Sequence, residues 1–336
     1  MPRPRALLCL NDDALASIYS PAERADLDAR LSWVAEPMNA KQLRERIAAD
    51  PKAFADTEVL VSGWGCPALD AELLAAMPNL ATVLYGAGSI KRVMTDAAWD
   101  RGVRVTTAYA MNAIPVAEFT VSQAVFCLKW GYQHMRDMKK TKAGGRKAGT
   151  PGAYGSTVGL VALGMIGRLV CERLKSYDVD VIAYDPFCSA GDAAALGVNL
   201  VSIEDVFRKS DVVSLHLPWL PETENMITGE LVASMRDHAS LLNTARGAVV
   251  DEDGLIAVLQ KRPDLVAVLD VTHPEPPVPD SPLWELDNVV LLPHIAGSTD
   301  GETPRMGRCM VDELDRYLAG KSFRWEVDRE RFKTMA

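Results

Sequence analysis

The sequence predicts a protein of two α/β domains, each built around a parallel sheet. Its 336 residues exceed one ordinary domain, and an apolar fraction of 48% is enough to bury a core in each of two. Short β-like runs alternate with helical segments through most of the chain, which is typical of parallel strands joined by crossover helices. A stretch rich in Gly and Lys at 142–155 interrupts this pattern and indicates a linker.

The order of the expected elements assigns them to the two domains. In the first third we expect strands at 6–10, 58–64, 80–88 and 103–109 and a helix at 40–50. One long helix is expected from Val116, over 116–140. The later part shows strands at 157–163, 180–185, 211–218, 239–247, 265–271 and 288–294, with helices at 165–177 and 251–260. An amphipathic helix at 304–320 is expected to pack back on the first domain, so we place the domains at 1–115 with 300–336 and at 116–299.

Composition favours small-molecule chemistry in a reducing compartment. A formal net charge of −9 and a pI near 5.2 weigh against a nucleic-acid partner, which normally meets a basic face. The six cysteines form no CxxC pair, the N-terminus does not resemble a signal peptide, and no uninterrupted apolar stretch is long enough to span a bilayer. We therefore expect a cytoplasmic protein with no membrane partner. The basic stretch at 136–147 fits a solvated helix face or linker, and we assign it no function.

A glycine-rich turn follows the first strand of the second domain. In G-x-G-x-x-G turns the first glycine permits a tight bend, the second lets the backbone approach a pyrophosphate, and the third lets the helix pack against the strand. The corresponding residues are Ala162, Gly164 and Gly167. Alanine is tolerated at the first position if φ stays negative there. Met165 and Ile166 would then begin a helix whose N-terminus binds the pyrophosphate of a dinucleotide.

Asp185 ends the next strand, at about the spacing of ~20 residues expected for an acid that binds the adenosine ribose. Its carboxylate would accept hydrogen bonds from the ribose hydroxyls and repel a 2′-phosphate, and the following Pro186-Phe187 offers no cation. NAD is therefore favoured over NADP. The alternative is a chance glycine-rich turn in an unrelated α/β protein, with Asp185 as a helix cap before Pro186.

Three later segments each deliver a polar residue to the end of an expected strand, where an open parallel sheet binds its ligands: Arg246, Glu275 and His294. An imidazole exchanges a proton near neutral pH, so His294 is the candidate general acid/base. Glu275 would orient the ring and stabilise its protonated form. Arg246 would grip a substrate carboxylate and polarise the reacting oxygen. This set fits hydride transfer between a nicotinamide and a 2-hydroxy or 2-keto acid.

Each of the three residues also has a structural interpretation. Arg246 could be a surface ion-pair partner, Glu275 a solvated loop acid, and His294 a satisfied histidine at a strand end. His216 and His273 compete for the imidazole role. Because His216 ends an earlier strand, we interpret it as structural or adjacent to the cofactor.

Several motifs together resemble the D-isomer-specific 2-hydroxyacid dehydrogenase family. They are the A-x-G-x-x-G turn, YDP, HLPWLPETENMI, NTARGAVVDEDGL, LDVTHPEPP and LLPHIAGST. In the first third, PNLATVLYGAGS resembles the substrate loop of that family, and NAIPVAEFTV resembles its domain crossover. The resemblance implies a discontinuous flavodoxin-like substrate domain and a Rossmann-type, doubly wound NAD-binding domain. It also implies a homodimer joined through the cofactor domain, with an active site in a cleft that closes to exclude water.

The resemblance assigns a role to individual residues. Arg246 would bind substrate, Glu275 and His294 would form the proton relay, and Asp185 would bind the ribose. Asp270 would meet the nicotinamide carboxamide, although it could instead cap a strand end. The backbone amides of Ala87 and Gly88 would receive the substrate carboxylate, and Trp64 is a candidate for shaping the substrate pocket.

Three departures from the family pattern concern affinity and specificity. Ala162 replaces a glycine and bears on cofactor affinity, whereas Ser89-Ile90-Lys91 and Thr272 bear on the substrate. Glu275 disfavours a formate dehydrogenase, which has glutamine there, and no lysine matches the substrate loop of phosphite dehydrogenases. Phosphoglycerate, glyoxylate, hydroxypyruvate and bulkier 2-keto acids stay open. The alternative from another class is an NAD(H)-sensing, non-catalytic corepressor on the same fold.

Overall fold

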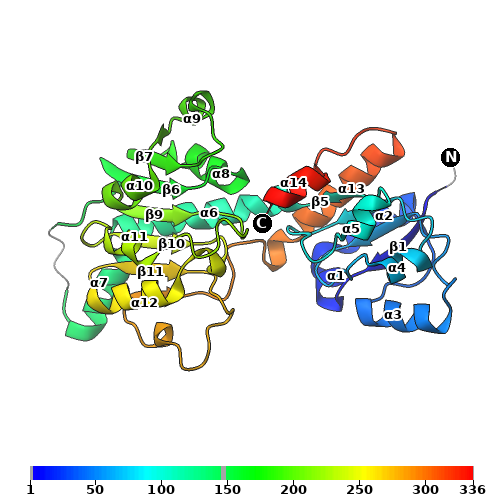
Figure 1. The fold of residues 1–336 in the computed structure, drawn as a ribbon, viewed down its shortest axis with the longest axis horizontal. Helices are drawn as coiled ribbons and strands as arrows, with labels where there is room; N and C mark the ends of the chain where they lie inside the picture. Colours follow the sequence, from blue (N-terminus) through cyan, green and yellow to red (C-terminus); the bar gives the residue numbers. More distant parts are fainter. Residues whose placement is uncertain (1–2, 145–148, 336) are drawn as a thin grey trace. The chain divides into compact units, whose positions relative to one another are not determined.

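The computed structural model describes residues 3–144 and 149–335, so 145–148 of the expected linker lie outside the described residues. The chain divides into two compact units (Figure 1). Unit 1 comprises Met1–Asn112 and Ser298–Met335, and unit 2 comprises Ala113–Gly297. We expected the boundaries at 115/116 and 299/300. Each unit is an α/β layer structure, as the alternation of strand and helix patterns predicted.

Unit 1 contains a six-stranded sheet in the order β13-β5-β4-β3-β1-β2. Its strands are β1 (Arg5–Cys9), β2 (Ser32–Trp33), β3 (Val59–Ser62), β4 (Thr82–Tyr85), β5 (Arg104–Thr107) and β13 (Glu326–Val327). The first five pair in parallel, and their order 2-1-3-4-5 is that of flavodoxin-like sheets. β13 comes from the far end of the chain and pairs antiparallel with β5.

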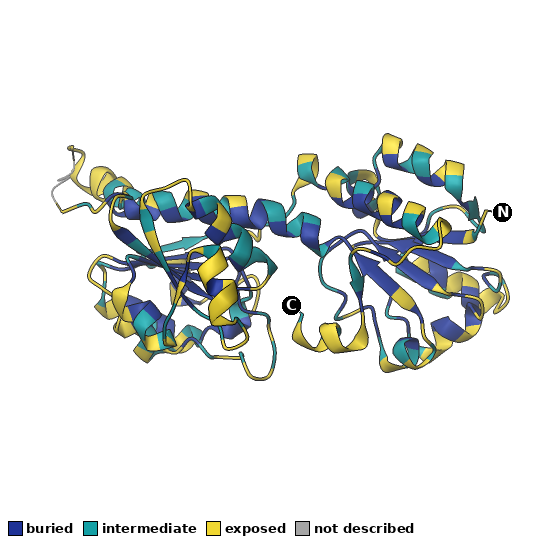
Figure 2. Cartoon of the chain, turned by 90° about the horizontal axis from the view of Figure 1, so that it is seen from above, coloured by how far each residue is buried: buried dark blue, intermediate teal, exposed yellow. Residues whose placement is uncertain are grey.

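Helices cover both faces of this sheet, so its strands are buried on both sides. They are α1 (Asp12–Ile18), α2 (Pro21–Arg30), α3 (Ala40–Ala49), α4 (Ala71–Ala76), α5 (Asp96–Asp100), α13 (Pro304–Leu318) and α14 (Arg329–Thr334), with a 3-10 turn η3 at Asp300–Glu302. Alternate residues of β1 enter different cores: Leu7 packs with α3 and α4, whereas Leu8 packs with α1 and α13. Successive side chains of a strand point to opposite faces, so near-continuous apolar runs mark such strands. Figure 2 shows these strands in dark blue.

Unit 2 contains a seven-stranded sheet in the order β12-β11-β10-β9-β6-β7-β8, and its recorded pairings are parallel. Its strands are β6 (Ser156–Val161), β7 (Val179–Tyr184), β8 (Asn199–Leu200), β9 (Val212–Leu215), β10 (Ser240–Asn243), β11 (Val266–Leu269) and β12 (Val289–Leu291). The order reverses between β6 and β9. In open parallel sheets, ligands bind outside the carboxyl ends of the strands at this switch point.

The helices of unit 2 form two layers around this sheet. They are α6 (Tyr109–Leu128), α7 (Gly131–Thr141), α8 (Met165–Leu174), α9 (Ala190–Leu196), α10 (Ile203–Lys209), α11 (Gly229–Ala233) and α12 (Glu252–Lys261), with 3-10 turns η1 (Gly247–Val249) and η2 (Pro282–Trp284). One core joins the sheet to α10, α11 and α12, and a second joins it to α6 and α8. Leu241 lies in the first core and Leu242 in the second, so β10 is buried on both faces.

The expected single helix at 116–140 is wrong in its bounds. The structure has two helices, α6 and α7, because Trp130 between them adopts a left-handed backbone with φ of 49°. α6 also begins earlier than expected, at Tyr109, and contains Pro115. By length and composition α6 is apolar enough to cross a membrane, whereas we expected no such stretch. A buried core helix meets the same criteria, and half of the apolar window of α6 is buried inside the protein.

Candidate functional site

The glycine-rich turn joins β6 to α8 at the switch point of the unit 2 sheet. Ala162 donates its amide to the carbonyl of Tyr184 at 2.8 Å, and its φ is +78°. We expected a negative φ at this alanine, and that expectation is wrong. The turn keeps the left-handed backbone that glycine normally supplies, and a non-glycine residue in that region costs about 1–3 kcal/mol.

The other two positions of the turn behave as the fingerprint requires. A Cβ added at Gly167 would lie 2.3 Å from the Ala162 carbonyl oxygen, so only glycine lets the helix approach the turn. A Cβ at Gly164 would meet nothing within 4 Å, and no side chain caps α8. The first-turn amides, including those of Met165 and Ile166, have no partner within the helix. Open space beside unpaired amides fits a pyrophosphate.

Asp185 follows β7 and connects that strand end to the turn. One carboxylate oxygen accepts from the amide of Leu163 at 2.6 Å, and the other accepts from Phe187 and Cys188 at 2.7 and 2.8 Å. The helix-cap role that we set beside ribose binding is not what the structure shows, because the next helix, α9, begins at Ala190 and is capped by Ser189. Asp185 instead fixes the turn after β7, and each carboxylate oxygen can accept a further hydrogen bond, as ribose binding requires.

Arg246 lies beyond the end of β10 and is positioned by Asn243, which the sequence analysis did not single out. The Asn243 side chain accepts from the Ala245 amide at 3.0 Å and donates to the Arg246 carbonyl at 2.9 Å. The only sign of Asn243 in the sequence was that a polar residue ends an apolar run, after Leu241 and Leu242. Burial lowers the pKa of the Arg246 guanidinium, and the nearby Glu275 carboxylate opposes this effect.

A close backbone approach brings the Arg246 segment to the Glu275 segment. A Cβ at Gly247 would lie 2.0 Å from the carbonyl carbon of Thr272, so this contact requires glycine. His294 Nδ1 lies 2.7 Å from Glu275 Oε1, with the two side chains 49% and 43% exposed. This contact is the imidazole–carboxylate pair that the sequence predicted.

Asp270 fixes the loop that carries His294. The Asp270 carbonyl accepts from the His294 amide at 3.0 Å, and its carboxylate accepts from Ile295 and Ala296 at 2.8 and 2.9 Å. Asp270 is 1% exposed, so its charge is compensated mainly by these amides. His294 itself has a φ of 56°, and such a backbone persists only where its surroundings hold it.

The two rival histidines occupy different environments. Burial lowers the pKa of His216 to about 4. Its Nε2 lies 3.1 Å from Ser214 Oγ, and its Nδ1 has no partner among the described residues. His273 is exposed, and its ring lies edge-on to Trp219 at 5.1 Å. Among the described residues neither ring pairs with a carboxylate as that of His294 does, and His273 meets Glu252 only through its backbone amide, at 3.3 Å. This difference favours His294 as the acid/base.

The remaining predicted residues lie in unit 1, after β3 and β4. Trp64 is 39% exposed, and its carbonyl accepts from the Asn11 amide at 2.9 Å. Ala87 is buried, and its amide donates to Tyr85 at 2.8 Å. Within the described part of the chain, the amide of Gly88 has no acceptor. Of the two amides expected to receive a carboxylate, Gly88 is the unengaged one.

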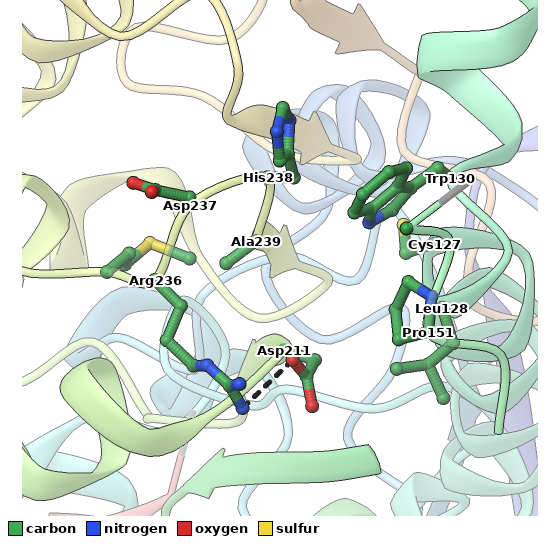
Figure 3. Close-up of a pocket in the computed structure, with 11 residues that line it drawn as sticks. Cys127, Leu128, Trp130, Pro151, Asp211, Arg236, Asp237, His238 and Ala239 are labelled. Atoms are coloured by element: carbon green, nitrogen blue, oxygen red, sulfur yellow. Dashed lines mark ion pairs between the residues drawn. The ribbon is translucent and has the colours of Figure 1, made fainter. Parts of the chain in front are cut away.

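A cavity of about 540 Å³ lies elsewhere in unit 2, at the amino ends of β9 and β10 (Figure 3). Asp211 and Arg236 pair across it at 3.0 Å, and the rings of Trp130 and His238 lie 4.6 Å apart at its edge. None of the predicted catalytic or cofactor residues lines it. It lies at the opposite end of the sheet from the site that the strand order indicates.

Comparison with known proteins agrees with this geometry. Residues 122–296 match the NAD-binding domain of the D-isomer specific 2-hydroxyacid dehydrogenases. A D-3-phosphoglycerate dehydrogenase of Mycobacterium tuberculosis is 35% identical over 91% of this chain and 57% of its own length. A glyoxylate reductase of Korarchaeum cryptofilum is 32% identical over 85% of each chain. The crystal structure of a phosphoglycerate oxidoreductase from Rhizobium etli superimposes with a TM-score of 0.80 at 25% identity, covering 98% of this chain and 99% of that one.

The comparisons confirm the expected NAD cofactor and the expected fold. The chain spans only about half the length of the D-3-phosphoglycerate dehydrogenases that it matches. With more than half of the chain matched by the family's NAD-binding domain, and with relatives above 30% identity along most of their length, this chain belongs to the D-isomer-specific 2-hydroxyacid dehydrogenase family.

Proposed function

We propose that this protein interconverts a 2-keto acid and a 2-hydroxy acid with NAD, using His294 as the general acid/base. The observation that carries the proposal is the 2.7 Å contact between His294 Nδ1 and Glu275 Oε1. It lies at the carboxyl end of the parallel sheet, where Arg246 also follows a strand. General acid/base catalysis by a positioned histidine contributes about 10²–10⁴-fold to such reactions.

The histidine–glutamate pair would control the proton. A hydrogen bond from Nδ1–H to Glu275 fixes the imidazole tautomer and orientation, leaving Nε2 to face the substrate oxygen. In the reducing direction, protonated His294 donates its Nε2 proton to the oxygen of the 2-keto group, and in the oxidising direction neutral His294 accepts it. Glu275 stabilises the imidazolium form. The bound nicotinamide supplies or accepts the hydride at the carbon.

Arg246 would hold and polarise the substrate. A planar guanidinium binds a carboxylate in a bidentate manner, and its attraction for oxygen is stronger where water is partly excluded. Burial around Arg246 supports this role. From unit 1 we propose the amides of Ala87 and Gly88 as carboxylate donors, with Trp64 shaping the pocket.

For the cofactor, we propose that Asp185 selects NAD over NADP. Its carboxylate is available to the ribose hydroxyls and would repel a 2′-phosphate. Asp270 is proposed to meet the nicotinamide carboxamide. The resemblance to the family also leads us to propose a homodimer.

A substrate screen tests the proposed function. The purified protein is mixed with NADH and a panel of 2-keto acids: glyoxylate, hydroxypyruvate, its 3-phosphate and bulkier acids. Loss of the nicotinamide absorbance with at least one acid, abolished by His294→Ala, is the expected result. Tight NADH binding without turnover of any acid would contradict the proposal and favour a non-catalytic NAD(H) sensor.

A further inference from the structure

The loop that follows β4 is fixed at both of its ends but not in between. Tyr85 accepts from the Ala87 amide, and Val93 accepts from the amide of Leu69 at 2.9 Å. Ile90 and Val93 are 1% and 3% exposed, so they anchor the end of the loop in the core. The segment between Ala87 and Ile90, which contains the unengaged amide of Gly88, has no comparable anchor among the described backbone bonds.

Lys91 connects this loop to the last helix of the chain. Its ammonium donates to the carbonyls of Phe332 at 2.6 Å and Lys333 at 3.4 Å, and it lies 4.6 Å from the centre of the Phe332 ring. No carboxylate of the described residues pairs with it. Burial lowers the pKa of Lys91. Its charge is therefore compensated by main-chain oxygens and an aromatic face.

These carbonyls belong to the final turn of α14 (Arg329–Thr334), drawn in red in Figure 1. The last carbonyls of a helix have no partner within it, and the helix dipole places negative partial charge there. A cation at this end donates hydrogen bonds to these carbonyls and is attracted by the partial charge. A side chain of similar length with neither charge nor donor, such as methionine, would do neither.

Three side chains of α14, Arg329, Arg331 and Phe332, attach the helix to the rest of unit 1. Arg329 pairs with Asp96 at 2.5 Å and with Asp100 at 2.7 Å, both on α5. Phe332 packs edge-on against Trp99 of the same helix, with ring centroids 5.4 Å apart. Exposed ion pairs contribute little, so the aromatic contact is the main attachment.

A further contact completes the attachment of α14. The guanidinium of Arg331 lies 4.9 Å from the centre of the Tyr109 ring and donates to its hydroxyl. α14 is thus attached at α5 and at the start of α6. The contact of Lys91 with α14 links the loop to this fixed helix.

We propose that α14 is a strap that holds the substrate loop, and that Lys91 is the residue through which it positions the Gly88 amide. This inference rests on the proposed function of the loop as the carboxylate-binding segment. Without the strap, residues 88 and 89 would be less ordered before substrate binds, and the entropy lost on ordering them would weaken substrate affinity. The proton relay lies in other residues, so turnover at saturation would be retained.

Variants at two neighbouring positions test the proposal. Lys91→Met removes the charge and keeps the apolar stem, Lys91→Arg keeps a cation, and Arg92→Met is the matched control, because Arg92 is exposed and pairs with no carboxylate among the described residues. For Lys91→Met we expect the KM for the 2-keto acid to rise about five- to tenfold, the scale of the net contribution of one intramolecular hydrogen bond. We expect kcat and NADH affinity to stay unchanged. Lys91→Arg should restore the KM, and Arg92→Met should not change it.

Hydrogen exchange gives a readout that does not depend on activity. Amides in 86–93 should exchange faster in Lys91→Met than in the parent protein, and those of β1 should not. Deleting α14 after Asp328 should reproduce both effects, and adding Lys91→Met to the deletion should change nothing more. Unchanged exchange and KM in Lys91→Met would overturn the strap, as would a loss of kcat in place of a rise in KM. A parent protein that reduces no 2-keto acid would instead overturn the proposed function. The exchange data would still show whether α14 holds the loop through Lys91.

Discussion

The two ends of the unit 2 sheet share an unusual backbone and differ in how their polar groups are used. At the carboxyl end Ala162 and His294 have φ of 78° and 56°, and at the amino end Trp130 and His238 have φ of 49° and 63°. The amino end also has a cavity of about 540 Å³. Left-handed backbone and hollow space therefore do not by themselves distinguish the two ends.

What differs is the kind of polar group that has no partner. At the amino end Arg236 pairs with Asp211, and the unpartnered atoms among the described residues are buried uncharged ones such as Ser210 Oγ and Ser240 Oγ. At the carboxyl end the first amides of α8 and the second nitrogen of His294 have no acceptor or donor among the described residues. The comparison teaches that unpaired polar groups at the strand switch point indicate a ligand site better than cavity volume does.

The largest expected difference between the two ends is catalytic. Replacing His294 with Ala should lower kcat for a 2-keto acid by about a hundredfold or more, because the general acid/base is lost. His238→Ala removes a histidine with the same left-handed backbone from the other end and should leave kcat unchanged. Steady-state assays with NADH measure both variants. Near-parent turnover in His294→Ala would exclude its assignment.

Carboxylates at the two ends should differ in their effect on stability because only that of Asp270 is fully buried. Asp270→Asn turns an NH₂ group toward the amide of Ile295 or Ala296, which should lower the unfolding free energy by about 2 kcal/mol. Asp211 also accepts a backbone amide, from Thr157 at 2.8 Å, but it is partly exposed. Asp211→Asn should therefore cost less than about 1 kcal/mol. Urea denaturation of both variants measures the difference, and equal losses would contradict the comparison.

The pH dependence of stability should identify His216 as the buried histidine. Its folded pKa of about 4 lies below the ordinary 6.5. The unfolded chain therefore binds the proton more readily, and stability falls as the pH decreases from about 6.5 toward 4. Between pH 7.5 and pH 5 this group should remove about 2 kcal/mol. His216→Asn should abolish that part of the loss, whereas His238→Asn should keep it. An identical pH slope in His216→Asn and the parent would show that His216 does not titrate in this way.

The smallest effect concerns backbone strain at the glycine-rich turn. Ala162→Gly relieves the positive φ at the entropic cost of a glycine, so we expect a net gain of about 0.5–1 kcal/mol in unfolding free energy. Removal of the methyl group near the phosphates should also tighten NADH binding, which a fluorescence titration measures. His238→Gly relieves the same kind of strain but loses the ring contact with Trp130, so it should give no net gain. A destabilised Ala162→Gly protein would show that the turn is not strained.

Much of the site could be predicted because its residues end strands. Asp185, Arg246 and His294 each follow an apolar run, and parallel strands bring their carboxyl ends to one edge. Asn243 was missed because its role is a pair of local backbone hydrogen bonds, and any polar residue at a strand end gives the same sequence signal. The break between α6 and α7 was missed because the periodicity continues through Trp130, whose left-handed backbone has no signature in the sequence pattern.

The sequence by itself determined the two α/β units, the dinucleotide turn and the order of the catalytic segments, because periodicity and strand-end polarity are local properties. Only the tertiary structure decided that Ala162 keeps a positive φ, since the bonds to Tyr184 and Asp185 close that turn. It also decided that Lys91 meets Phe332, a residue 241 positions away. Such contacts depend on how distant segments pack, and no local pattern encodes that.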